Sequence, residues 1–385
     1  MTHPLRIAIV SGEESGDLLG HDLIVALQQQ SGRQVDLVGV GGRHLQQLGL
    51  QPLFDPSDIA LMGVSAVVRD LPRLVYRINT TARAIVAARP DCLITVDSPA
   101  FTLRVAKKVR ALAPEIPVVK YVCPSVWAWG PGRAKQMKPY VDRVLCILPF
   151  ETQVLQDLDG PEGIYVGHRL VTEPGLLAAA DKQRSRDAES ARKTLLVLPG
   201  SRRAEVAGLM EPFGEVVRLL QKRGHAIDVV IPTVPHVAEL VTQAAKGWPT
   251  APQVVQGEIA KTEAFARADL AMAASGTVLL ELALARVPMI SCYSTDIVMK
   301  LATRFITTWS AALPNLIADR VVVPEFINDY LRPALMARQL EALIQGPARQ
   351  AQLDGFDEVV RRMATDRPSS QIAAEAVLDL IKTRN

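Results

Sequence analysis

Apolar runs of five or six residues alternate along the chain with longer segments in which apolar residues recur at helical spacing. A helical pattern over about 16–30 follows the first run, and the runs in this part of the chain are Leu5–Val10, Val35–Val40, Cys92–Val96, Val118–Val122 and Arg143–Leu148. Continuous apolar strands separated by helices are typical of a parallel sheet that helices cover on both faces. The first half of the chain is therefore expected to be an α/β domain.

A polar segment, Asp181–Lys193, then interrupts the pattern as a linker or the end of a surface helix. The pattern restarts with a helix over Ala204–Lys222 and with strands at Thr194–Leu198, Ile227–Ile231, Asp269–Ala273 and Pro288–Cys292, and the tail from about Pro333 is helical. We predict two Rossmann-like domains, 1–180 and 193–345, that face a cleft, the usual ligand site of such a pair. The remaining residues, 346–385, are predicted to be helical, and the resemblance described below implies that they pack back on the first domain.

The composition of the 385 residues is that of a globular protein, with 49% hydrophobic and 22% charged residues. Lys and Arg number 43 and Asp and Glu 40, so the formal charge is 43 − 40 = +3. A charge this small, together with only 5% aromatic residues, indicates no nucleic acid among the partners.

The four cysteines, Cys92, Cys123, Cys146 and Cys292, are widely spaced and form no C-x-x-C pair. This spacing argues against a disulfide framework or a structural zinc site and fits a reducing compartment. The longest apolar stretch, 270–285, is too short and too polar to span a bilayer. We therefore expect a cytoplasmic protein, or one bound to a membrane from outside.

Two short loops connect predicted strands to predicted helices: Ser11–Asp17 (SGEESGD) and Pro199–Arg202 (PGSR). Small residues let a ligand approach the backbone there, and the N-terminus of the following helix favours an anion. Arg202 can form paired hydrogen bonds with a phosphate. The first loop lacks G-x-G-x-x-G, so it indicates no dinucleotide site. Simple helix capping, in the first loop by Ser15 or Asp17, explains both loops as well.

A third strand-to-helix loop, Ala274–Glu281 (ASGTVLLE), carries the strongest local signal. Backbone N–H groups at Ser275, Gly276 and Thr277 can hold a diphosphate. Glu281 lies one helical turn after Thr277, where its carboxylate can accept the hydroxyls of a ribose. The alternative is a capped helix with a solvated Glu281, although a carboxylate among leucines usually needs a partner.

Two further motifs follow predicted strands. In Val96–Pro99 (VDSP), Pro99 restricts Ser98 to an extended backbone, so Asp97 would project at the strand's carboxyl edge as a general base. The alternative is a turn aspartate bonded to its own backbone. In Tyr121–Trp129 (YVCPSVWAW), two tryptophans indicate either a ligand wall or a core loop, and a basic patch follows at 133–138.

These motifs together resemble the lipid-A-disaccharide synthases, a family of inverting glycosyltransferases with the two-Rossmann GT-B architecture. The ordered set spans nearly the whole chain: GEESGD (Gly12–Asp17), LMGVSAV (Leu61–Val67), VDSPAF (Val96–Phe101), YVCPSVWAW (Tyr121–Trp129), LPFE (Leu148–Glu151), VGH (Val166–His168), LPGSRRAEV (Leu198–Val206), ASGTVLLE (Ala274–Glu281) and LPNLIA (Leu313–Ala318). Any one of these motifs is weak, whereas the ordered set is specific.

The resemblance implies transfer of a sugar from UDP-2,3-diacylglucosamine to 2,3-diacylglucosamine 1-phosphate (lipid X), with release of UDP and without a metal or other cofactor. It implies that Asp97 is the catalytic base and Glu13 the acidic residue of the first loop. The residues it assigns to the UDP-sugar are Arg202, Ser275, Gly276, Thr277, Glu281 and Asn315. Those it assigns to the acceptor and its loops are Ser15, Ser125, Trp127, Trp129 and His168.

The chain departs from the family pattern at Glu14, Ala100, Gly130 and Arg169. These changes add one carboxylate, remove another and relocate a positive charge, so they bear on recognition of the acceptor phosphate. Two competing functions stay open: another UDP-sugar enzyme of this fold, and a catalytically weakened relative that binds a nucleotide sugar or lipid.

An apolar segment edged by basic residues suits a membrane surface that carries anionic lipid. The residues that we assign to it are Met62, Val67, Val68, Arg69, Arg73 and Arg77. A helix packed on the core is the alternative. Together with the resemblance, this segment predicts a peripheral protein on the inner face of the inner membrane. Whether the protein forms a homodimer stays open at this point.

Overall fold

The computed structural model describes residues 3–60, 71–186, 192–294 and 306–384. They form two compact units, one from Met1–Arg169 with Thr365–Asn385 and the other from Leu170–Ala364. The sequence suggests a joint within 181–193, whereas the units divide after Arg169. The helix α8 (Pro174–Arg184) packs against α11 (Glu258–Arg267), which makes it part of the second unit.

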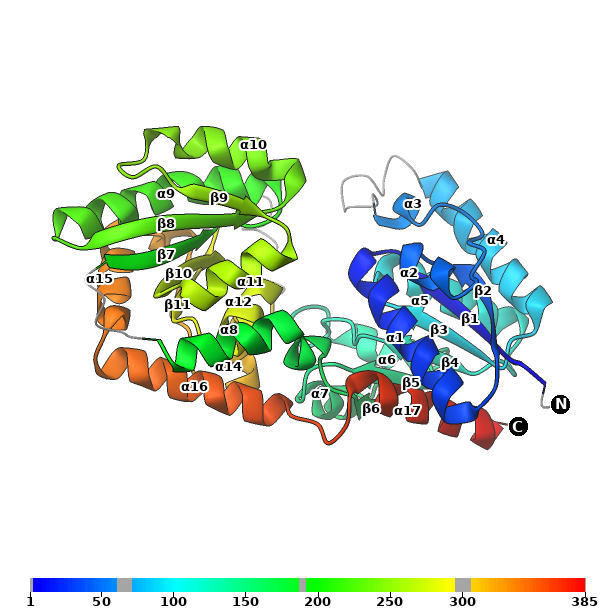
Figure 1. Cartoon of the computed structure of the whole chain (residues 1–385). Helices are drawn as coiled ribbons and strands as arrows, with labels where there is room; N and C mark the ends of the chain where they lie inside the picture. The colour runs from blue at the N-terminus through cyan, green and yellow to red at the C-terminus, as the bar shows by residue number, and fades with distance from the viewer. Residues whose placement is uncertain (1–2, 61–70, 187–191, 295–305, 385) are drawn as a thin grey trace. The chain divides into compact units, whose positions relative to one another are not determined.

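The first unit is built on a six-stranded parallel sheet in the order β2-β1-β3-β4-β5-β6 (Figure 1). Its strands are β1 (Leu5–Ser11), β2 (Val35–Val40), β3 (Cys92–Val96), β4 (Val118–Tyr121), β5 (Arg143–Cys146) and β6 (Glu162–Tyr165). Its helices are α1 (Glu14–Ser31), α2 (Arg43–Gln47), α3 (Ser57–Ala60), α4 (Leu71–Ala88), α5 (Pro99–Leu112), α6 (Gly132–Met137), α7 (Glu151–Asp157) and α17 (Ser369–Arg384). The 3-10 turn η1 (Arg169–Thr172) spans the point where the chain passes from the first unit to the second.

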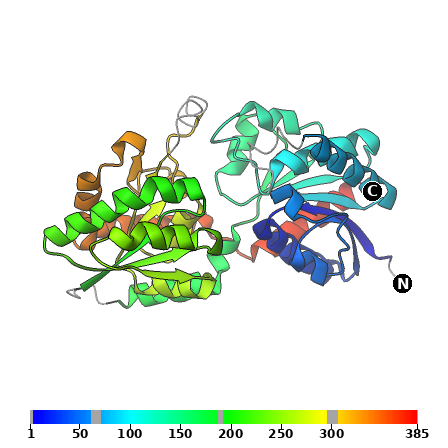
Figure 2. The ribbon, with the colours of Figure 1, turned by 90° about the horizontal axis from the view of Figure 1, so that it is seen from above.

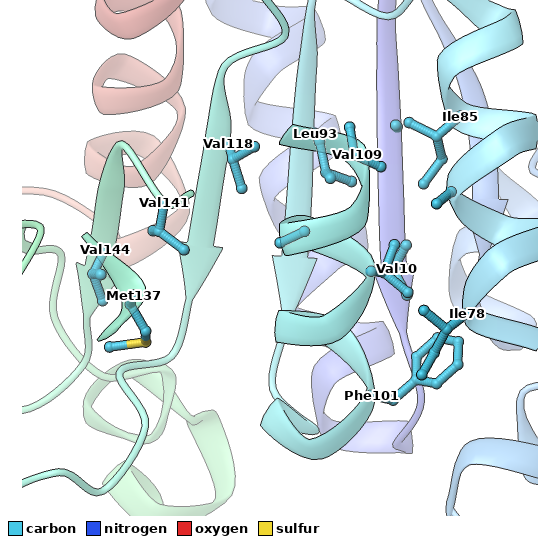
Figure 3. Packing of buried hydrophobic residues seen from close by; sticks show 14 of the residues in the cluster. Val10, Ile78, Ile85, Leu93, Phe101, Val109, Val118, Met137, Val141 and Val144 are labelled. Atoms are coloured by element: carbon cyan, nitrogen blue, oxygen red, sulfur yellow. The ribbon is translucent and has the colours of Figure 1, made fainter. Parts of the chain in front are cut away.

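Alternate residues of β1 point to opposite faces of this sheet, so each face has its own core. Ala8 and Val10 pack with α4 and α5, and Figure 3 shows Ile78 and Phe101 of these helices close to Val10. On the opposite face, Leu5, Ile7 and Ile9 pack with α1 and α17. Within the predicted helical tail 346–385, the helix α17 contacts α1. Both ends of the chain lie on the first unit (Figure 2).

The second unit repeats the architecture with a parallel sheet in the order β12-β11-β10-β7-β8-β9. Its strands are β7 (Arg192–Leu198), β8 (Ala226–Thr233), β9 (Gln253–Gln256), β10 (Leu270–Ala274), β11 (Met289–Tyr293) and β12 (Glu325–Ile327). With α8 and α11, its helices are α9 (Arg203–Lys222), α10 (Pro235–Ala244), α12 (Thr277–Leu284), α14 (Leu313–Ala318), α15 (Pro333–Ile344) and α16 (Pro347–Met363), with 3-10 turns η2 (Ala245–Gly247) and η4 (Asn328–Tyr330). The prediction of two Rossmann-like α/β units is confirmed.

Candidate functional site

Each sheet has one place where the strand order reverses. In the first unit β1 pairs with β2 on one side and with β3 on the other, so the strand order reverses at β1. In the second unit β7 pairs with β8 on one side and with β10 on the other, so the order reverses at β7. Ligands of open α/β sheets bind at such switch points, beyond the carboxyl ends of the strands. Glu13 and Asp97 follow β1 and β3, while Arg202 and Ser275 follow β7 and β10. The predicted residues that follow these four strands therefore lie at the two switch points, whereas the predicted residues after β4 and β6 and those on α4 and α14 lie elsewhere.

At the first switch point the backbone of Asp97 and Ser98 is left-handed, with φ of 46° and 39°. Side chains other than glycine rarely adopt this conformation, because Cβ crowds the backbone, and it persists only where surrounding contacts enforce it. The expectation that Pro99 keeps Ser98 extended is thus wrong. The backbone N–H of Asp97 donates to the carbonyl of Tyr121 at 3.1 Å, which ties this turn to the end of β4.

The carbonyl oxygen of Asp97 accepts two hydrogen bonds from side chains. Lys120 Nζ donates to it at 2.5 Å and Thr102 Oγ1 at 2.7 Å. Lys120 lies in β4 and is fully buried. Burial lowers the pKa of Lys120 to about 8, and the nearby carboxylates of Asp97 and Glu13 oppose this shift. Lys120 is not among the residues predicted from the sequence, although a lone lysine in an apolar parallel strand is a signal that could have found it.

The first loop, Gly12–Asp17, forms one wall of a cavity of about 420 Å3 that includes Glu13 and Arg43 in its lining. Glu13 immediately precedes α1, and Ser98 Oγ donates to its carboxylate at 3.4 Å, which links the loop to the Asp97 turn. Asp17 is buried and accepts hydrogen bonds from the backbone N–H groups of Gly42 and His44. The loop is therefore held from the β2 side through Asp17.

Ser15 is exposed in the first turn of α1. Glu14 pairs with Arg43, which also lines the cavity, at 2.5 Å. Ala100 is exposed in the first turn of α5.

The tryptophan loop after β4 is held by a buried carboxylate. Glu151 accepts hydrogen bonds from Trp127 Nε1 at 3.3 Å and from the N–H groups of Ile147 and Leu148 at 3.0 Å each. Burial raises the pKa of Glu151 to about 7, and these donors oppose the shift. Trp127 is therefore fixed in the loop, and its ring also meets Phe150 edge to face.

Trp129 is half exposed, at 51%, and Ser125 is exposed beside it. The Arg133 guanidinium lies 3.7 Å from the centre of the Trp129 ring and donates to the carbonyls of Ser125 and Trp129. Gly130 has a φ of 59°, which a residue with a side chain would adopt only with strain. Arg133 thus provides a positive charge next to the loop.

His168 follows β6 and is partly buried. Burial, together with the neighbouring Arg169, lowers the pKa of His168 to about 4, so its imidazole is neutral near pH 7. Arg169 Nε lies 3.4 Å from Asp22 Oδ2, so this departure from the family pattern is neutralised by a carboxylate of α1.

One cluster of metal-ligating side chains occurs among the described residues. Sulfur and carboxylate atoms of Cys123, Cys146 and Glu151 lie within 4.8 Å of one another, and all three side chains are buried. The carboxylate already accepts three hydrogen bonds, one from Trp127 of the tryptophan loop and two from the backbone N–H groups of Ile147 and Leu148 after β5. Glu151 therefore has a structural task, and the cluster fits loop packing without an ion.

At the second switch point, Gly200 and Glu205 shape the loop after β7. The carboxylate of Glu205 accepts the N–H groups of Ser201 and Arg202 and pairs with the Arg202 guanidinium at 2.8 Å. A Cβ on Gly200, which has a φ of 101°, would lie 2.3 Å from Glu205 Oε2, so only glycine fits. Arg202 remains 80% exposed and can reach a ligand.

Gly276 directly precedes α12, and Gly276 and Thr277 are exposed there. Ser275 Oγ donates to the carbonyl of Ala311 at 2.9 Å. The expectation that Glu281 needs a partner is met by Lys261 of α11, whose Nζ lies 2.9 Å from its carboxylate. Burial raises the pKa of Glu281, and the Lys261 ammonium opposes that shift.

Asn315 does not face a ligand, contrary to the sequence-based expectation. It is fully buried, and its side-chain oxygen accepts the N–H groups of Val322 and Val323. Its amide donates to Ser310 Oγ and to the carbonyl of Val323. Because the 310–312 segment receives the hydrogen bond of Ser275, Asn315 acts by holding that segment in place.

Four residues of the predicted membrane segment, Met62, Val67, Val68 and Arg69, lie outside the described residues. Arg73 and Arg77 lie on α4 and both pair with Asp58, at 2.7 and 2.9 Å. Val75 and Tyr76 of the same helix are exposed, whereas Leu74 and Ile78 belong to the core. Within the described ranges, no helix has the length and apolar character needed to cross a bilayer.

Comparison with known proteins identifies relatives over nearly the whole chain. The sequence profile of the family described as "Lipid-A-disaccharide synthetase" matches residues 7–376. The lipid-A-disaccharide synthase of Nitrobacter winogradskyi is 45% identical over 381 residues, which cover 98% of this chain and 96% of the relative. That of Nitrobacter hamburgensis is 46% identical over 378 residues, with 97% and 95% covered.

Solved structures share the fold at low identity. Acinetobacter baumannii MurG has a TM-score of 0.60 at 15% identity and covers 99% of this chain and 100% of its own. The S. aureus MnaA–UDP co-structure has a TM-score of 0.60 at 14% identity, with 98% and 96% covered. These neighbours support the GT-B architecture.

Proposed function

Because the chain belongs to the lipid-A-disaccharide synthase family, we propose that it transfers 2,3-diacylglucosamine from UDP-2,3-diacylglucosamine to the 6-hydroxyl of 2,3-diacylglucosamine 1-phosphate. The transfer inverts the anomeric carbon and releases UDP. The chain is thus a glycosyltransferase of lipid A synthesis, with a UDP-sugar donor and a lipid acceptor. The observation that carries the division of labour is the placement of Glu13 and Asp97 after β1 and β3, at one switch point, and of Arg202 and Ser275 after β7 and β10, at the other.

In this proposal, Asp97 is the general base at the first switch point. Its carboxylate takes the proton of the acceptor 6-hydroxyl as the oxygen attacks the anomeric carbon from the face opposite UDP. A fixed backbone supports this role, because general-base catalysis needs the carboxylate within hydrogen-bond reach of one hydroxyl. Glu13 binds the acceptor alongside, where Ser98 links it to the Asp97 turn.

The second switch point binds UDP. As the bond between the anomeric carbon and the diphosphate oxygen breaks, negative charge grows on UDP and must be stabilised. The exposed Arg202 and the backbone N–H groups of Gly276 and Thr277 are suited to that charge. The N–H of Ser275 donates to the carbonyl of Cys292, so Ser275 would contribute through its hydroxyl. Glu281, one turn further along α12, accepts the ribose hydroxyls. Its pairing with Lys261 holds the carboxylate in place.

The chain is proposed to act as a peripheral protein on the inner face of the inner membrane. Support comes from α4, which exposes Val75 and Tyr76 next to Arg73. Apolar and aromatic side chains beside a cation suit the interface of an anionic bilayer. Changing Val75 and Tyr76 together to Ser should weaken sedimentation with phosphatidylglycerol vesicles, with the exposed Leu112→Ser on α5 as control. Equal binding by both proteins would exclude α4 as the contact.

The reaction is tested with purified protein, UDP-2,3-diacylglucosamine and lipid X, by following UDP release and disaccharide formation. Asp97→Asn should lower kcat by about 10²- to 10⁴-fold and leave UDP affinity unchanged, since general bases contribute in that range. Asp36→Asn, an exposed carboxylate on β2, is the control. Near-normal turnover by Asp97→Asn would refute the base. UDP-sugar binding without any turnover by the unaltered protein would instead favour a binding protein.

A further inference from the structure

We propose that Lys120 is a positioning residue for the transfer reaction, which holds the Asp97 backbone so that its carboxylate meets the acceptor hydroxyl. The inference rests on the proposed role of Asp97 as base. Lys120 does not reach the carboxylate itself. Its Nζ donates to the Asp97 carbonyl, 2.5 Å away, and so acts through the backbone.

Burying a lysine at this position lowers the stability of the folded state unless its ammonium group finds partners. Lys120 is fully buried in β4, where its strand neighbours Val119 and Tyr121 are buried as well. Removing an ammonium group from water without a compensating partner is strongly unfavourable. The partners that the structure provides are the Asp97 carbonyl and Thr102 Oγ1, the latter at 3.4 Å. The buried charge is therefore directed at the turn that carries Asp97.

The turn needs such support, because two successive non-glycine residues in it have positive φ. The Asp97 carbonyl accepts both Lys120 Nζ and Thr102 Oγ1, and Thr102 Oγ1 lies 3.1 Å from the Ser98 carbonyl as well. Without these donors the strained backbone would relax toward ordinary angles. Since the carboxylate is attached to that backbone, its direction would change, and small displacements of a reacting group slow a reaction strongly.

The test compares substitutions of the two residues that donate to the Asp97 carbonyl, Lys120 and Thr102, with two matched controls. Lys120→Met removes the charge at similar volume, and Thr102→Val removes the second donor. Arg143→Met removes another buried cation of the same sheet, from β5, which bonds Glu162 and Asp379 instead. Thr81→Val removes a buried hydroxyl that has no hydrogen-bond partner among the described residues.

We expect Lys120→Met to lower kcat by about 10- to 100-fold while KM for both substrates changes less than about threefold, since a misdirected base slows chemistry rather than binding. Thr102→Val should lower kcat less, and both controls should stay near the parent value.

Each outcome decides the question. A kcat for Lys120→Met equal to that of Arg143→Met would overturn the positioning role while leaving Asp97 as base. If Lys120→Met does not fold, Thr102→Val decides in its place. A kcat of Thr102→Val equal to that of Thr81→Val then counts against the proposal that these donors position Asp97. Near-normal turnover by Asp97→Asn refutes the base itself, and the positioning role fails with it.

Discussion

The two switch points have the same topology but are built by opposite means. In the first unit, the loops after β3 and β4 hold three non-glycine residues with positive φ: Asp97, Ser98 and Val122. In the second unit, the loop after β7 places Gly200 at the position with positive φ. The first site thus holds side chains in a strained backbone, whereas the second avoids strain with glycine.

The difference follows from what each site has to hold. A general base must present one carboxylate in one direction, so a side chain is needed even where glycine would fit more easily. A diphosphate is held by backbone N–H groups and a cation, and glycine lets the ligand come close to the backbone. The supports differ accordingly: a buried lysine in the first unit, and a buried asparagine network in the second.

The largest expected effect concerns the buried support of the first site. Because burial lowers the pKa of Lys120 from 10.5 to about 8, the native state releases this proton before the unfolded state does. Between about pH 8 and 10.5 the unfolded state binds more protons, so the stability contribution of Lys120 rises with pH, by about 3 kcal/mol in total.

Urea denaturation at several pH values measures this effect as the difference between the parent protein and Lys120→Met. The difference should grow in favour of the parent across that interval. Arg143→Met is the control, since arginine does not titrate there. A difference that stays flat with pH would show that Lys120 is not the costly support that distinguishes the first site.

The support of the second site is tested by Asn315→Ala. Several buried partners would be left unsatisfied, and the free energy of unfolding should fall by about 2 kcal/mol. UDP affinity should fall too, because the segment that receives the Ser275 hydrogen bond loosens. Asn79→Ala on α4, where the side chain makes one bond to the Val75 carbonyl, should change stability by less than about 0.5 kcal/mol. Unchanged UDP affinity in Asn315→Ala would separate this network from ligand binding.

Gly200→Ala tests whether the second site depends on glycine. We expect a stability loss of about 1.5 kcal/mol and weaker UDP binding, because Cβ would be strained and would displace Glu205. Gly224→Ala is the matched control, since its φ is also positive but no heavy atom lies within 4 Å of the added Cβ. Titration calorimetry with UDP and thermal unfolding measure both effects. Equal losses of stability and of UDP affinity in the two variants would mean that backbone strain alone explains them, with no special role for Gly200.

The smallest effect is expected from Ser98→Gly, which makes the first site resemble the second. Relief of the left-handed strain should raise stability by about 1 kcal/mol, while kcat falls because the turn loosens and Glu13 loses its hydrogen bond. Asp319→Gly, at a left-handed position that ends α14, should gain stability without losing activity. A fully active Ser98→Gly would mean that the strain serves no catalytic purpose.

Much of the fold was predictable because parallel strands are buried on both faces and read as apolar runs. The strand β2 coincides with the predicted Val35–Val40, and β3 with Cys92–Val96. The strands β6, β9 and β12 were missed, since each is short and only partly buried and so lacks an apolar run. The loops that follow buried strands then located the candidate residues.

The details of the site were less predictable, because they depend on contacts between distant segments. The restriction that Pro99 places on Ser98 is local, and bonds from Lys120 and Thr102 overcome it. Asn315 lies in a motif that suggested ligand binding, yet its partners come from the segments around Ser310 and Val323. A polar residue in a loop does not reveal whether it faces inward.

The return of the last helix to the first unit affects how the chain can fold during synthesis. The side chain of Gln30 bonds the carbonyl of Gln371, across 341 positions, and α17 covers the apolar face of α1. Domains usually fold in the order in which the ribosome releases them. Here residues 170–364 can complete their core first, while the older N-terminal segment keeps the α1 face uncovered until α17 emerges. That face is where a nascent chain would need a chaperone.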